Sequence, residues 1–144
     1  MTDYGMPARA DELTVEAAAE RLTQVQAFLD ERLEAAGCPM RAKMQLGVAV
    51  EEIFVNIASY AYAPETGSAT IRIELFDAPR AVTVSFFDSG RPYDPLSRED
   101  PDVTLPAQER GIGGLGILMT KKLMDGVRYE YRGGQNILTL EKRF

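Results

Sequence analysis

Apolar residues recur at helical spacing in the first part of the chain. Thr14 is a suitable N-cap, and Gly37 and Pro39 are suitable terminators, so the pattern predicts a first helix between them. Its apolar stripe consists of Ala18, Leu22, Val25, Leu29, Leu33 and Ala36. Residues 11–15 are also compatible with a short edge strand, and so brief a pattern does not separate a strand from an ordered tail.

A second helix is predicted from about Met40 to Tyr62. Its packed side carries Leu46, Val50, Phe54, Ile57 and Ala61. At about 100° per residue, the opposite side gathers Gln45, Ala49, Glu52, Asn56, Ser59 and Ala63. Solvated faces usually carry long charged side chains rather than alanine and serine. We therefore interpret this side as the wall of a site, with a solvated polar face as the alternative.

Two hairpins follow from alternating patterns. Residues 70–75 and 81–87 alternate on either side of a turn at residues 77–80, and the second strand leads into Asp88-Ser89-Gly90. Residues 127–132 and 136–142 form the second pair around Gly133-Gly134. The alternating apolar residues of this second hairpin, Val127, Tyr129, Tyr131, Leu138 and Leu140, are assigned a structural role.

Between the hairpins the sequence predicts a long loop and a short helix. Residues 91–110 contain four prolines and little periodicity, which is typical of a lid. Residues 111–116 read Gly-Ile-Gly-Gly-Leu-Gly and precede a helix over residues 117–124. The inward positions expected near this helix are Leu115, Leu118, Met119 and Leu123. Glycines at a helix start let backbone amides approach phosphate oxygens, although no Gly-Lys-Ser/Thr follows as in a P-loop.

The order of these elements favours an α+β fold. We expect a two-layer α/β sandwich with a mixed, mainly antiparallel sheet and helices on one face. The length of 144 residues suits a single domain, residues 11–144, after a flexible segment, residues 1–10. No apolar run approaches a membrane span, and the start lacks the features of a secretory signal, so we expect a cytoplasmic protein.

Composition narrows the chemistry further. The formal charge of −6 argues against direct nucleic-acid binding. The chain has no histidine and one cysteine, Cys38, which excludes Ser-His-Asp and Cys-His catalytic pairs and a typical zinc site. Any general base must then be a carboxylate, a lysine or a tyrosine. Glu52, on a face of small residues, is the candidate.

Three stretches carry a family resemblance. Residues 52–56 (Glu-Ile-Phe-Val-Asn), residues 88–92 (Asp-Ser-Gly-Arg-Pro) and the glycine-rich residues 111–116 resemble, in order and spacing, the N, G1 and G2 boxes of the GHKL (Bergerat-fold) ATP-binding proteins. Chain size and the ending Leu-Met-Asp-Gly-Val at residues 123–127 resemble the stand-alone anti-sigma factor serine/threonine kinases. One departure is Tyr60-Ala61-Tyr62, where that family commonly has His-Ala-Tyr.

The resemblance implies ATP and Mg²⁺ as cofactors and assigns residue roles. Asn56 would coordinate Mg²⁺, Glu52 would act as general base, and Asp88 would accept the exocyclic amine of adenine. The implied nucleotide-binding residues are Asn56, Asp88, Gly90, Pro92, Arg110, Gly111, Gly113, Gly114, Leu115 and Gly116. Glu51 is the alternative base, and Arg98 competes with Arg110 for the terminal phosphate.

The implied function is partner switching. The resemblance predicts an anti-sigma factor with ATP-dependent serine/threonine kinase activity, which sequesters a sigma factor and phosphorylates a serine of an antagonist protein. It also suggests a homodimer. The alternative is a non-catalytic ATP-binding module that captures a partner protein.

Overall fold

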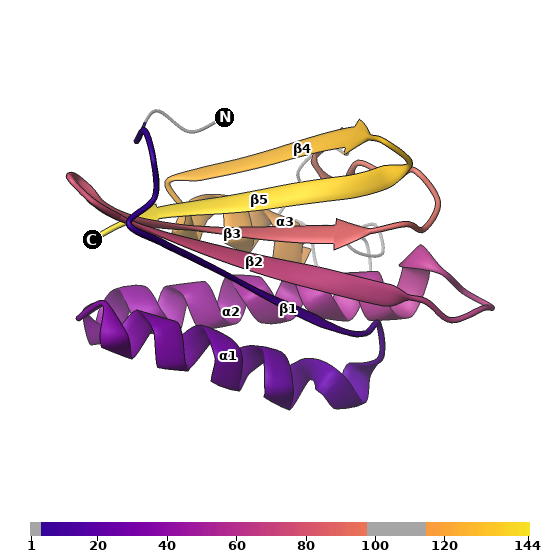
Figure 1. Cartoon of the computed structure of the whole chain (residues 1–144). Coiled ribbons are helices and arrows are strands. Elements are labelled where there is room, and N and C mark those ends of the chain that lie inside the picture. Colours follow the sequence, from indigo (N-terminus) through magenta and orange to yellow (C-terminus); the bar gives the residue numbers. More distant parts are fainter. Residues whose placement is uncertain (1–3, 98–114) are drawn as a thin grey trace, which may run out of the picture.

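Five strands form one sheet in the order β1-β2-β3-β5-β4, and every pairing is antiparallel (Figure 1). The computed structural model describes residues 4–97 and 115–144. The strands are β1 (Arg9–Glu16), β2 (Ser68–Asp77), β3 (Arg80–Asp88), β4 (Gly126–Arg132) and β5 (Gln135–Arg143). The helices are α1 (Leu22–Ala35), α2 (Met40–Asn56) and α3 (Leu115–Leu123), with short turns η1 (Ala19–Arg21), η2 (Ile57–Ala61) and η3 (Pro95–Ser97).

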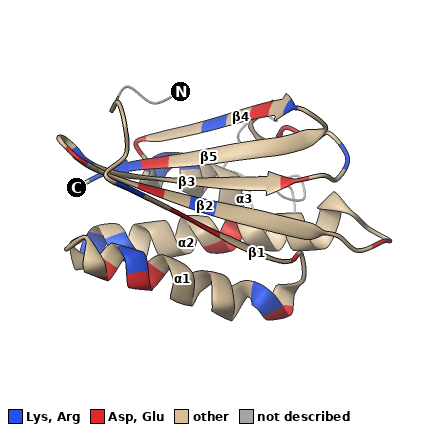
Figure 2. Cartoon of the chain, in the orientation of Figure 1, with Lys and Arg blue, Asp and Glu red and all other residues tan. Residues whose placement is uncertain are grey.

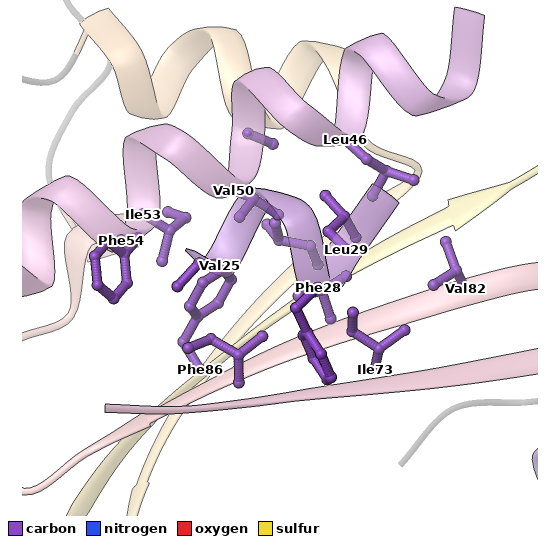
Figure 3. Packing of buried hydrophobic residues seen from close by; sticks show 14 of the residues in the cluster. Val25, Phe28, Leu29, Leu46, Val50, Ile53, Phe54, Ile73, Val82 and Phe86 are labelled. Carbon is purple, nitrogen blue, oxygen red and sulfur yellow. The ribbon is translucent and has the colours of Figure 1, made fainter. Parts of the chain in front are cut away.

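The main core lies between the sheet and the helices. Figure 3 shows Val25, Phe28 and Leu29 of α1 and four residues of α2 facing strand residues such as Ile73 and Phe86. The register aligns the apolar positions, because Phe86 of β3 lies between Ile71 of β2 and Leu138 of β5. Burying each large apolar side chain contributes about 1.5–3 kcal/mol, so this face holds the two layers together. The predicted α+β two-layer fold is confirmed.

Both predicted hairpins are confirmed, as is the end of the first helix. The pairs are β2–β3 and β4–β5. Gly37 adopts a φ of +70°, and the backbone N–H of Cys38 donates to Leu33 O at 2.9 Å, the arrangement that closes a helix with a left-handed residue. Arg80, at the start of β3, donates to Ala36 O at 2.6 Å and thereby satisfies a terminal carbonyl.

The predicted start of the first helix after Thr14 is wrong. Residues 9–16 form β1, and Thr14 Oγ1 is hydrogen-bonded to Thr70 Oγ1 at 2.8 Å instead of capping a helix. Leu13 and Val15 point to the core, and pairing with β2 fixes all eight residues as an edge strand. That pairing joins segments more than 50 residues apart, so the helical pattern around residues 14–22 was overridden by a long-range contact. The strand begins two residues before the expected domain start.

Three details of the other helices also differ from prediction. The α-helical part of the second helix ends at Asn56, and the chain continues to Ala61 as a π-turn. Ala49, assigned to the site wall, is fully buried. Among the α3 side chains whose burial the structure describes, Ile117 and Thr120 are buried, whereas Met119 is 50% exposed. None of the described helices has both the length and the hydrophobicity of a transmembrane span.

Candidate functional site

A cavity of about 700 Å³ lies beside the second half of α2. Its size is in the range of small-molecule and cofactor sites. The walls come from α2 and its π-turn, the end of β3, the following loop, the start of α3 and the β4–β5 pair. Ile53, Phe86 and Leu138 supply apolar surface, whereas Glu52, Asn56 and Asp88 supply polar groups. The arrangement is that of a mostly apolar cavity with a few fixed polar contacts.

Glu52 and Asn56 occupy one wall as a hydrogen-bonded pair. They are four residues apart on α2, and Asn56 Nδ2 donates to Glu52 Oε2 at 2.8 Å. In the part of the chain that the structure describes, Asn56 Oδ1 accepts no hydrogen bond. Figure 2 shows acidic colour in the otherwise uncharged second half of α2, where residues 51 and 52 stand. The pair therefore offers a carboxylate and a free amide oxygen to the same space.

Glu51, the alternative base, lies elsewhere. Its side chain is exposed, and it does not line the cavity that Glu52 lines. The two neighbours differ because successive helix residues are about 100° apart. The geometry therefore favours Glu52.

Asp88 ends β3 and is only 6% exposed. Its Oδ1 accepts hydrogen bonds from the Gly90 backbone N–H at 3.0 Å and from Asn136 Nδ2 at 2.9 Å. No hydrogen bond within the described residues uses Oδ2. A buried carboxylate with one unused oxygen is suited to accept a hydrogen bond from an amine on a ligand.

The loop after Asp88 rests on the end of the α2 π-turn. The Arg91 backbone N–H donates to Ala61 O at 3.2 Å, and the Arg91 guanidinium donates to Tyr60 O at 3.0 Å. A Cβ on Gly90 would fall 2.2 Å from Ala61 O, which is closer than real Cβ atoms approach. Glycine at position 90 is therefore required for this contact.

Most of the predicted site residues within the described ranges come together. Glu52, Asn56, Asp88, Pro92 and Gly116 line the cavity, and Gly90 holds the adjoining loop. Leu115 is the first residue of α3. Five predicted residues lie outside the described residues, namely Arg98, Arg110, Gly111, Gly113 and Gly114.

Sequence reasoning missed Asn136 and Tyr129, which also line the cavity. Asn136 shares a strand face with Leu138 and Leu140, and one polar residue in that apolar alternation was the available signal. The Tyr129 hydroxyl donates a hydrogen bond to Asn136 Oδ1. Burial raises the pKa of this hydroxyl, so Tyr129 stays protonated and remains a donor.

A comparison with known protein families matches the segment that contains this site. A family model described as histidine kinase-like ATPase domain matches residues 15–142. The chain belongs to this family. The match includes both Glu52 and Asn56 of α2 and Asp88 of β3, and it confirms the resemblance to GHKL ATP-binding proteins.

Individual relatives of this histidine kinase-like ATPase domain are named as kinases. The serine/threonine-protein kinase BtrW of Bordetella bronchiseptica is 27% identical over 135 residues, 94% of this chain and 94% of BtrW. The serine-protein kinase RsbW of Listeria monocytogenes is 31% identical over 108 residues, 72% of this chain and 68% of RsbW.

A solved structure shares the fold. The crystal structure of the RsbU and RsbW domains of Rv1364c from Mycobacterium tuberculosis matches with a TM-score of 0.67 and 20% identity. The match covers 95% of this chain and 33% of that chain, so this chain spans about a third of its length. The likeness supports the two-layer architecture described above.

Proposed function

We propose that this protein is an ATP-dependent serine/threonine protein kinase that acts on a small antagonist protein and also sequesters a sigma factor in the cytoplasm. One observation carries the proposal: the hydrogen-bonded Glu52–Asn56 pair lines the same cavity as the buried Asp88. Membership of an ATPase-domain family and relatives named as serine kinases support it. The sigma factor, the antagonist protein and the homodimer are proposed from the family resemblance.

Mg-ATP fits the polar groups of the cavity. Mg²⁺ is usually held by one or two protein oxygens together with phosphates and water, and Asn56 Oδ1 is one suitable hard ligand. Within the described residues no group of three histidine, cysteine, aspartate or glutamate side chains is placed to hold a metal ion. Mg-ATP, when bound, supplies the phosphoryl group that is transferred.

The chain's own residues divide the remaining work. Asp88 Oδ2 accepts a hydrogen bond from the exocyclic amine of adenine and thereby orients the nucleotide. Glu52 accepts the proton of the attacking serine hydroxyl, since a carboxylate is the available base in a chain without histidine. The Asn56 amide N–H donates a hydrogen bond to the Glu52 carboxylate. The residue that would bind Mg²⁺ therefore also orients the proposed general base.

Nucleotide binding is the first test. Calorimetric titration with ATP, with and without Mg²⁺, should show Mg²⁺-dependent binding in the wild type and a large loss in Asp88→Asn. This substitution is expected to weaken binding because it replaces a charged acceptor, by about tenfold or more. A folded wild type that binds no ATP at millimolar concentration would exclude the proposal, because such weak affinity is worth less than about 4 kcal/mol.

Transfer is the second test, with Glu51 as the matched control. Labelled ATP and candidate antagonist proteins from the same genome should give phosphoserine with the wild type and with Glu51→Gln. Glu52→Gln should still bind ATP but lose about 10²–10⁴-fold in transfer rate, the usual contribution of a general base. Tight ATP binding without transfer to any antagonist would instead select a non-catalytic, nucleotide-regulated module that captures its partner.

A further inference from the structure

Asn136 is the centre of a buried hydrogen-bond network at one end of the cavity. It lies near the start of β5, directly opposite Asp88 in the β3–β5 register, and is 7% exposed. Its Nδ2 donates to Asp88 Oδ1 at 2.9 Å and to Arg91 O at 2.8 Å. Its Oδ1 accepts from the Tyr93 backbone N–H at 3.0 Å and from the Tyr129 hydroxyl. One amide of β5 is thus hydrogen-bonded to β3, to β4 and to the loop between Asp88 and η3.

These partners allow one orientation of the amide. In the inverted orientation the amide NH₂ would face the Tyr93 N–H, and the amide oxygen would face the Asp88 carboxylate. Both contacts would be repulsive, because donor would meet donor and acceptor would meet acceptor. Tyr129 strengthens the observed orientation, since its hydroxyl donates to the same oxygen as Tyr93.

The network determines how many carboxylate oxygens of Asp88 are free to accept a hydrogen bond from a ligand. Oδ1 already accepts two hydrogen bonds, from Gly90 and Asn136. Within the described residues Oδ2 has no such partner. A carboxylate with two free oxygens can pair with the N1–H and the 2-amine of guanine together. A carboxylate with one free oxygen instead suits the single 6-amine on the edge of adenine.

We propose that Asn136 is a positioning residue that sets base selectivity: it occupies Asp88 Oδ1, leaves Oδ2 as the single acceptor, and so favours ATP over GTP. Tyr129 acts indirectly, because its hydrogen bond to Asn136 Oδ1 fixes the orientation of the Asn136 amide. This inference rests on the proposed function, because it requires that the cavity bind a nucleotide through Asp88.

The test compares ATP and GTP affinities by calorimetry for the wild type, Asn136→Leu and Tyr129→Phe. Asn136→Leu should reduce the preference for ATP over GTP by about tenfold or more, because Asp88 Oδ1 then keeps only the hydrogen bond from Gly90 and can accept a second one from a ligand. Tyr129→Phe should reduce it less, by a few-fold. Circular dichroism melting identifies variants that are unfolded.

Thr139→Val is the matched control. Thr139 Oγ1 is hydrogen-bonded to Ser85 Oγ at 3.0 Å, so the substitution removes a contact between the same two strands on the opposite sheet face. It should leave the ATP-to-GTP preference unchanged.

Each outcome decides a separate point. If the wild type binds ATP and a folded Asn136→Leu loses affinity for both nucleotides by the same factor, the positioning role is excluded and the proposed function stands. If the wild type binds no ATP, the proposed function fails and this inference fails with it. If Asn136→Leu does not fold, Tyr129→Phe decides: a reduced preference supports the inference, and an unchanged preference overturns it.

Discussion

Gly116, the second residue of α3, lies directly against the carboxylate of Glu52 on α2. A Cβ on residue 116 would fall 2.1 Å from Glu52 Oε1, whereas real Cβ atoms essentially never come closer than 3.0 Å to another heavy atom. These atoms are the end of a flexible side chain, so a larger residue at position 116 would require the Glu52 carboxylate to leave its observed position. The position of the proposed general base is set by a residue that is 64 positions away in the sequence.

Gly116→Ala is expected to displace either the Glu52 side chain or the first turn of α3. Since misplacing a catalytic group by about 1 Å can lower a rate on the order of 10²-fold, phosphoryl transfer should fall by about that factor. Transfer assays and ATP titrations measure the effect. Transfer at the wild-type rate would show that Glu52 has room to adapt without consequence.

Gly47→Ala is the control for a glycine-to-alanine change within a helix. A Cβ at Gly47 of α2 would meet only Gln26 Oε1 at 3.7 Å, an ordinary contact. The free energy of unfolding should rise by about 0.5–1 kcal/mol, because alanine is the better helix former. Urea unfolding measures this change, and nucleotide binding should stay the same.

Asn56→Ala should remove the Mg²⁺ dependence of ATP binding. The substitution deletes the free amide oxygen and the donor to Glu52, so Mg²⁺ should no longer improve affinity, a loss of about tenfold or more. Ser59→Ala is the control, because Ser59 is exposed one turn later and does not line the cavity. An unchanged Mg²⁺ effect in Asn56→Ala would exclude Asn56 as the metal ligand.

Tyr62→Phe should destabilise the junction between the α2 π-turn and the sheet. The Tyr62 hydroxyl donates to Ser68 O at 2.6 Å and accepts from the Ser89 backbone N–H at 2.7 Å. Losing both bonds should lower the free energy of unfolding by about 1–2 kcal/mol, measured in urea. Tyr60→Phe is the control, since Tyr60 is 66% exposed and its hydroxyl forms no hydrogen bond within the described residues. Equal effects of both substitutions would contradict this role.

Tyr4 should make stability sensitive to alkaline pH. Burial, followed by the hydrogen bond to Glu141, raises the pKa of Tyr4 to about 12, from about 10 in an unfolded chain. The stabilisation is fully present below pH 10 and is lost as the pH rises from about 10 towards about 12, since folding favours the protonated form. Tyr4→Phe should therefore flatten the decline in the free energy of unfolding between about pH 10 and about pH 12, measured by urea unfolding. Equal slopes for wild type and Tyr4→Phe would contradict the assignment.

The sequence predicted those features that local geometry controls. Glu52 and Asn56 share a helix face because their four-residue spacing is close to one helical turn. Asp88 stands at a strand end because the alternation of residues 81–87 stops there and a turn sequence follows. Both hairpins and the overall layer arrangement follow from the same local patterns. Identification of the family rested on the order of these motifs.

Tertiary contacts decided the features for which the local sequence was ambiguous or silent. Residues 9–16 became β1 because β2 offered a complete set of strand partners, and Met119 is exposed because α3 packs along other positions. Asn136 meets Asp88, 48 residues away in the sequence, because the β3–β5 register sets the two residues opposite each other. No local sequence pattern predicts this contact, since the register of an antiparallel sheet depends on how whole strands pair. The sequence by itself determined which polar groups stand at element ends, and only the folded sheet determined which of them meet.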